Sequence, residues 1–144
     1  MSRLPRSNVI VLDNEAVQAL RSPSHPKHGK VVKYVRVAVG RRRRVVPSST
    51  LVPAAVRAEA GWDRTDPAWT LVNRLPIVDV SLDTAIANAM VAIRRRVDRP
   101  VSVVDAHVGA VVQAADAGRV TIITSDPRDM AAVAEDTPVV VVAI

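Results

Sequence analysis

Short apolar runs alternate with longer, mixed segments along this chain, and this alternation predicts strands and helices in turn. The short runs are rich in Val and Ile, the residues that favour strands. They predict strands at Val9–Asp13, within Val45–Val52, at Ile77–Val80, at Val120–Thr124 and at Val139–Ala143. We expect Pro47 and the Ser48-Ser49 pair to interrupt the second strand.

The segments between these runs carry helix signals, and breakers such as the prolines and glycine of Ser22–Gly29 separate them. Ser81 and Ser102 precede two of the predicted helices as caps, Gly118 follows one of them, and Pro occupies first-turn positions. The predicted helices are Asn14–Leu20, Lys30–Arg42, Pro53–Ala60, Thr65–Asn73, Leu82–Arg96, Val103–Ala117 and Asp126–Ala134.

Strands that alternate with helices predict an α/β fold with a parallel sheet and right-handed crossovers. The 144 residues suit one domain, 1–144, and we expect residues 1–8 to form a flexible N-terminus. The helix Val103–Ala117 is apolar almost all round, so it is predicted to lie deep in the core.

Composition narrows the classes of protein. The chain has no Cys, which excludes disulfides, Cys-based zinc sites and thiol nucleophiles. The apolar stretches fall well short of the roughly 20 residues that span a bilayer, and no signal-type segment follows the first residues. We therefore expect a cytoplasmic protein without a membrane segment.

The formal net charge is +6 and the isoelectric point is about 11.0. A positive surface favours a polyanionic partner such as nucleic acid. The run Arg41, Arg42, Arg43 and Arg44 is a candidate for contacts with RNA or an acidic partner protein, and a solvated helix end is the alternative. An Arg-rich, Ala-rich composition also fits a GC-rich genome, which accounts for part of the excess charge.

Acidic residues recur where strands are predicted to give way to helices. Asp13 ends the first strand, Glu59 lies on the helix after the second, Asp105 lies in the first turn of the apolar helix, and Asp126 follows the fourth strand. Ligands of open parallel sheets bind at the carboxyl ends of the strands. If the four carboxylates meet there, their mutual repulsion requires a cation, and hard divalent ions prefer oxygen ligands. These acids are the candidate metal ligands and catalytic residues.

Each acid taken singly also suits an ordinary structural role. Asp13 and Asp126 are good helix caps, Asp105 follows Ser102 as in a capping box, and Glu59 suits a solvated helix. Asp105 favours function most strongly, because a buried carboxylate needs a partner and its helix contains no Lys or Arg. Further candidates that could orient the acids or their water are Asn14, Thr124, Ser125 and Asp129.

The motifs in order resemble the PIN-domain ribonucleases, in particular the VapC-type toxins of actinobacterial VapBC toxin–antitoxin pairs. They are Asp13 after the first strand, Val52 to Glu59, Val104 to Val108, and Thr124-Ser125-Asp126-Pro127 with Asp129. The resemblance covers roughly Val9 to Ile144. Asn14-Glu15 departs from the family pattern, and the stretch Arg41 to Thr50 aligns poorly.

The resemblance implies a three-layer α/β/α sandwich around a central parallel sheet. It also implies that Asp13, Glu59, Asp105 and Asp126 bind Mg²⁺ or Mn²⁺ and that the protein hydrolyses RNA as an endoribonuclease. A small antitoxin and homodimers are the partners that it implies. The RNA target, the metal count and the general base are beyond the sequence.

Two other functions compete with the nuclease. A non-catalytic module on the same fold would bind RNA or an antitoxin without cleavage. A phosphotransfer receiver domain also gathers acids and Mg²⁺, but it requires a Lys near the last strand, and no Lys follows Lys33. A dinucleotide-binding domain is disfavoured because no Gly-rich loop follows the first strand.

Overall fold

The computed structural model of the chain describes residues 8–41, 48–115 and 117–144. Its centre is a five-stranded sheet in which every neighbouring pair of strands runs parallel. The strands lie in the order β3-β2-β1-β4-β5, which confirms the predicted parallel sheet. They are β1 (Asn8–Leu12), β2 (Ser48–Pro53), β3 (Ile77–Val80), β4 (Arg119–Thr124) and β5 (Val140–Ala143).

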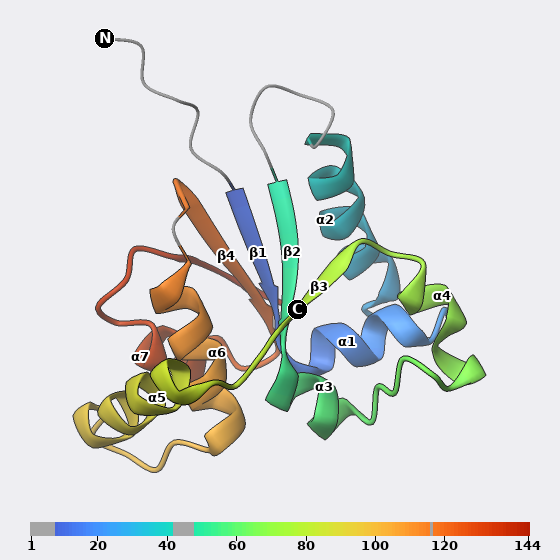
Figure 1. Ribbon diagram of the computed structural model, residues 1–144. Coiled ribbons are helices and arrows are strands. Elements are labelled where there is room, and N and C mark those ends of the chain that lie inside the picture. The colour runs from blue at the N-terminus through green and yellow to red at the C-terminus, as the bar shows by residue number, and fades with distance from the viewer. Residues whose placement is uncertain (1–7, 42–47, 116) are drawn as a thin grey trace, which may run out of the picture.

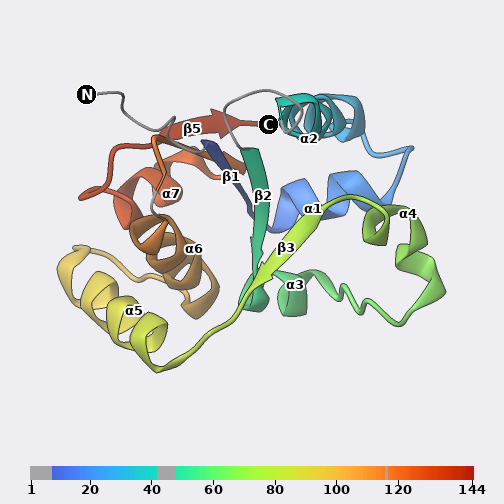
Figure 2. The same ribbon diagram turned by 45° about the horizontal axis from the view of Figure 1, so that its top comes forward.

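Helices cover both faces of this sheet (Figure 1, Figure 2). On one face lie α1 (Asn14–Arg21), α2 (His28–Arg41) and α4 (Thr70–Asn73), which a 3₁₀ turn at Pro67–Trp69 precedes. On the other face lie α5 (Thr84–Arg96), α6 (Val103–Ala114) and α7 (Pro127–Val133). The three-layer α/β/α sandwich expected from the family resemblance is therefore confirmed.

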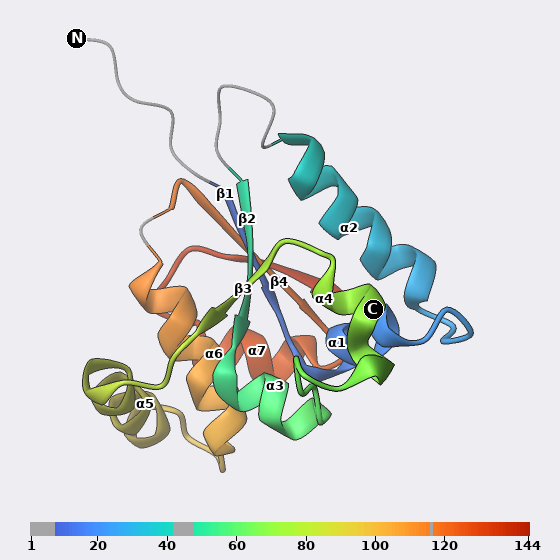
Figure 3. The ribbon, with the colours of Figure 1, turned by 45° about the vertical axis from the view of Figure 1, so that its right-hand side comes forward.

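The short helix α3 (Ala54–Ala60) lies at the carboxyl ends of the strands, where it contacts both α1 and α6 (Figure 3). Gly61 ends it in the left-handed conformation, with φ at 73°, which a residue without Cβ adopts at no steric cost. This helix thus bridges the two helical layers at the sheet edge where parallel α/β folds bind ligands.

The middle of the sheet is the core. Val11 and Leu12 of β1 and Ile122 and Ile123 of β4 are fully buried, because a parallel strand between two helical layers has no solvent face. The helix α6 is buried from Ala106 to Val112, as its all-round apolarity predicts. Its Gly109 allows the close approach of α7, since a Cβ there would lie 2.9 Å from the carbonyl oxygen of Val133.

Several predicted boundaries are wrong. The helix predicted from Leu82 begins at Thr84, because the Asp83 carboxylate and not Ser81 caps it, accepting from the Ile86 N–H at 2.8 Å. Ser48 and Ser49 belong to β2 and do not interrupt it, since β1 supplies their backbone partners.

Two further boundaries differ at helix ends. Pro53 is the last residue of β2, and α3 begins one residue later. The helix α6 ends at Ala114 and not at Ala117, because the backbone becomes extended at Ala115.

The basic run and the N-terminus lie largely outside the described residues. These include residues 1–7 of the predicted flexible terminus and Arg42, Arg43 and Arg44. Arg41 is the last residue of α2, but its side chain is not among the parts that the structure describes. Among the described residues, no helix combines the length and apolarity needed to cross a membrane.

Candidate active site

The site lies at the carboxyl ends of β1 and β4, the central strands of the sheet. From β1 the chain crosses to β2 on one side, whereas β4 lies on the other, so the two strands flank the point where the strand order reverses. Ligands of open α/β sheets bind at such a point. Asp13 directly follows β1, and Ser125 and Asp126 directly follow β4.

A single hydroxyl joins the two strand ends. Thr124 is fully buried, and its Oγ1 donates to Oδ2 of Asp13 at 2.7 Å. The same oxygen accepts from the backbone N–H of Asp126 at 2.9 Å. The other Asp13 oxygen, Oδ1, accepts from the Asn14 N–H at 2.7 Å. Asp13, which is 8% exposed, is therefore held in one orientation by two donors.

Asp105 approaches from α6. Ser102 caps that helix through the Asp105 N–H at 3.0 Å and so sets where its first turn begins. Burial first, then the negative charge of Asp13, raises the pKa of Asp105 to about 6. Asp129 and Asp126 add to the rise, while the Ser102 contact opposes it. Three other carboxylates are therefore near enough for their charges to act on Asp105.

The fourth acid, Asp129, lies one turn into α7. The Asp126 carboxylate caps α7 by accepting from the Asp129 N–H at 3.4 Å. The hydrogen-bonding Asp126 side chain, followed by burial, raises the pKa of Asp129. Arg99 lowers that pKa, with Nη2 3.0 Å from Oδ1 of Asp129. Asp13, Asp105, Asp126 and Asp129 are called the acid cluster below.

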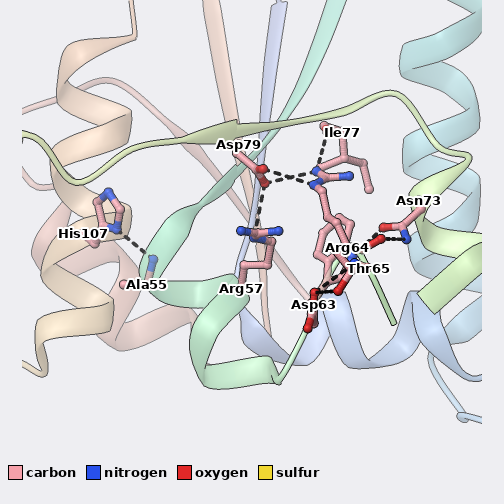
Figure 4. A network of polar contacts seen from close by, with 10 residues as sticks. Ala55, Arg57, Asp63, Arg64, Thr65, Asn73, Ile77, Asp79 and His107 are labelled. Atoms are coloured by element: carbon pink, nitrogen blue, oxygen red, sulfur yellow. Dashed lines mark hydrogen bonds and ion pairs between the residues drawn. The ribbon is translucent and has the colours of Figure 1, made fainter. Parts of the chain in front are cut away.

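Glu59 is not joined to the acid cluster in this way. It is exposed on α3, and its charge is not among those that raise the pKa of Asp105. It lies one helical turn after Ala55, whose N–H donates to Nδ1 of His107 on α6 at 3.2 Å (Figure 4).

His107 was expected to lie in the core or at its rim. It is fully buried between α6 and α3. Because Nδ1 accepts, the ring is neutral with its proton on Nε2, which has no hydrogen-bond partner among the described residues. Burial lowers the pKa of His107, and the nearby Ser81 backbone opposes this. The ring thus sets the spacing of α3 and α6 beside Asp105.

A second polar network holds α3 from its other side (Figure 4). Arg57 of α3 lies 3.5 Å from Oδ1 of Asp79 on β3, and Arg64 donates to both oxygens of that carboxylate at 3.1 Å. The same Arg64 guanidinium lies over the Trp62 ring, which stacks on Trp69 with centroids 5.7 Å apart. Both indoles are buried, so packing and not base stacking is their role.

The remaining residues with predicted supporting roles have mixed surroundings. Asn14 begins α1 beside Asp13, and its buried Oδ1 has no partner in the described part of the chain. Ser125 is exposed next to Asp126. Glu15, which departs from the family pattern, turns to His25 at 3.0 Å and Lys27 at 3.9 Å and so pairs outside the acid cluster.

The donor set fits a hydrated hard cation better than a fully protein-coordinated one. Within residues 8–41, 48–115 and 117–144, no three His, Cys, Asp or Glu side chains are close enough to form a ready-made metal cage. Mg²⁺ retains several waters and uses few direct carboxylates. The mutual repulsion that raises the pKa of Asp105, and the unpartnered Asn14 oxygen, are what such an ion with its water shell would relieve.

Several solved structures match this fold over most of their length. The crystal structure of VapC20 from Mycobacterium tuberculosis, a sarcin-ricin loop cleaving toxin, matches with a TM-score of 0.57 and 17% identity over 81% of this chain and 91% of that one. FitAB bound to the IR36 DNA fragment matches with a TM-score of 0.61 and 16% identity, over 92% of this chain and 94% of that one. FitAcB from Neisseria gonorrhoeae matches with a TM-score of 0.61 and 16% identity, over 92% of this chain and 96% of that one.

No protein-family model matches the chain, and no curated protein resembles it significantly in sequence. At this level of identity the structural matches speak for the fold. The chain has the PIN-like α/β/α fold of toxin–antitoxin proteins such as VapC20 and FitAB.

Proposed function

We propose that this protein is a metal-dependent endoribonuclease and the toxin of a type II toxin–antitoxin pair. The observation that carries the proposal is the acid cluster, which gathers Asp13, Asp105, Asp126 and Asp129 at the switch point of the sheet. VapC20, which shares the fold, is described as a sarcin-ricin loop cleaving toxin, and this supports RNA as the substrate. The net charge of +6 suits a polyanion.

The residues have distinct tasks in this proposal. Asp13, Asp105 and Asp126 would hold Mg²⁺ or Mn²⁺, and Glu59 on α3 would be a further ligand. When bound, the ion would lower the pKa of a water molecule and neutralise charge on the phosphodiester. Thr124 keeps the Asp13 carboxylate oriented, as its two hydrogen bonds require.

The reaction itself is a hydrolysis. Water attacks phosphorus, one P–O bond forms and the P–O bond to the leaving oxygen breaks. A carboxylate of the acid cluster, Asp105 or Asp126, accepts the proton of the attacking water. The leaving oxygen takes up a proton from solvent.

The partners follow from the same proposal. FitAB and FitAcB are complexes on the same fold, which supports a small antitoxin as the protein partner of this chain. We also propose a homodimer and a cytoplasmic location, where RNA and antitoxin are both present. The competing proposal is a module that binds RNA or antitoxin without cleavage. Such a module would use the same surface as the nuclease and would differ only in not hydrolysing RNA.

The decisive experiment is RNA cleavage by the purified protein with Mg²⁺, with Mn²⁺ and with EDTA. We expect cleavage with either metal and none with EDTA, and Asp13→Asn should reduce it to background while leaving the fold intact by circular dichroism. Glu135→Gln is the matched control, because Glu135 follows α7, its side chain is 72% exposed and it pairs with Arg96. Cleavage that survives EDTA or Asp13→Asn would contradict the proposal, and RNA binding without cleavage would favour the binding module.

A further inference from the structure

The acid cluster has a cation beside it for which the proposed chemistry has no use so far. Arg99 lies in the connection between α5 and α6, three residues before the Ser102 cap. Its Nη2 makes both of its described contacts, one to Oδ1 of Asp129 at 3.0 Å and one to the Arg128 carbonyl oxygen at 2.9 Å. Two acceptors thus hold the guanidinium at the rim of the acid cluster.

This geometry leaves part of the guanidinium available. A guanidinium has five N–H donors, and within the described residues only those on Nη2 are engaged. The side chain of Arg99 is 31% exposed, so Nε and Nη1 are not sealed in the core. A planar group with donors to spare matches the geometry of a phosphate.

The charges explain why a cation belongs here. An RNA phosphate that enters an uncompensated group of carboxylates meets strong repulsion, because like charges repel strongly where the effective dielectric constant is low. Arg99 already cancels part of this repulsion through its contact with Asp129. That contact occupies Oδ1 of Asp129.

We propose that Arg99 is a phosphate-binding residue that holds the RNA backbone at the rim of the acid cluster, anchored by Asp129. The inference rests on the proposed nuclease function and adds to it the residue that positions the substrate. It assigns Asp129 to Arg99 and not to the metal. It also predicts that Arg99 acts in opposite directions on the two ligands, strengthening RNA binding and weakening metal binding.

The test measures both ligands separately in Arg99→Gln. RNA binding is measured by fluorescence anisotropy with a structured RNA hairpin in EDTA, which prevents cleavage, at several salt concentrations. We expect a several-fold weaker affinity and a salt dependence reduced by about one phosphate contact. Mn²⁺ binding is measured without RNA, as the metal concentration that gives half of the rise in melting temperature. We expect this concentration to fall several-fold, because a positive charge has left the site.

Arg95→Gln is the matched control. It removes the same charge from an exposed position in the last turn of α5, four residues before Arg99, where the side chain is bonded to none of the four acids. Equal RNA affinity and salt dependence in the two variants would overturn the inference, and so would an unchanged or weaker response of Arg99→Gln to Mn²⁺. If the wild-type protein cleaves RNA and these outcomes appear, only the inference fails. If the wild-type protein neither cleaves RNA with metal nor binds the hairpin, both the inference and the proposed function fail.

Discussion

Thr124 shows how one buried side chain can organise two acids that are far apart in the sequence. Its hydroxyl donates to Asp13 and accepts from the Asp126 N–H, so both strand ends depend on one oxygen atom. A buried acceptor or donor that loses its partner costs free energy, and a carboxylate costs more than a neutral group. The orientation of Asp13 and the start of α7 are therefore coupled at this residue.

Thr124→Val replaces the hydroxyl with a methyl group of nearly the same shape. We expect the free energy of unfolding to fall by about 1–3 kcal/mol, because Asp13 and the Asp126 N–H each lose a partner. Cleavage of RNA should fall about 10- to 100-fold, as for other groups that orient metal ligands. Thr121→Val, three residues earlier on the same strand, is the control in denaturant unfolding. Equal losses in both variants would contradict the coupling.

Asp105 makes the stability of the metal-free protein depend on pH. Its pKa is raised from 3.8 to about 6 in the folded protein, so protonation favours the folded state. The stabilisation is complete below about pH 4 and is lost as the pH rises through 6. Above pH 6 the ionised, half-buried carboxylate destabilises the fold, and a bound cation would reverse this.

Asp105→Asn should therefore unfold at a higher denaturant concentration than the wild type at pH 8 in EDTA. The difference should shrink as the pH falls from 7 to 5, since both side chains are then neutral. In the wild type, Mn²⁺ should raise the melting temperature at pH 7.5 and much less at pH 5.5, because protons compete with the ion. A pH-independent difference between the two proteins would rule out the proposed origin of the raised pKa.

At the scale of elements, α6 and α7 carry Asp105, Asp126 and Asp129, and their separation decides how closely these acids meet. Gly109 sets that separation, since a Cβ there would lie 2.9 Å from the Val133 carbonyl oxygen and 3.1 Å from Cδ1 of Ile93. Side chains and backbone of three helices meet at this point. A tighter contact than van der Waals distance forces one helix to move.

Gly109→Ala is thus expected to destabilise the protein by about 1–3 kcal/mol through overpacking, and to weaken Mn²⁺ binding by moving α7. Gly29→Ala in α2 is the matched control, because nothing lies within 4 Å of its added Cβ. Gly29 is the second residue of α2, so this change should leave the stability unchanged or raise it by less than about 1 kcal/mol. Denaturant unfolding of both variants measures the contrast, and a loss of stability of the same size in each would refute it.

The same scale shows which elements could be read from the chain. The strands and the caps at Ser102 and Asp126 were predicted because they depend on neighbours within a few residues. Ser81 and Asp83 are both residue types that cap helices well. Asp83 caps α5 because the path of the chain after β3 places it at the first turn of that helix. Ser48 and Ser49 look like a break in a strand, yet pairing with β1 makes them part of it.

At the scale of the whole molecule, the proposal is that an RNA-cleaving site is exposed unless a partner covers it. Expression in a bacterial host should then arrest growth, and Asp13→Ala should restore it at equal protein level. Glu135→Ala, which changes an exposed acid that pairs with Arg96, should still arrest growth. Colony counts after induction, with immunoblots for protein amount, measure the effect. Arrest by Asp13→Ala at the same level would show that cleavage is not the cause.

Periodicity and local helix caps are enough to predict the alternation of strands and helices, the parallel sheet and the positions of Asp13 and Asp126 at matching strand ends. The tertiary structure alone decided which acids share a space. Asp129 joined the acid cluster and Glu59 did not, and Arg99, Thr124 and His107 acquired partners 29, 111 and 52 residues away. Such contacts arise from the packing of helices against the sheet, and no local pattern of residues encodes them.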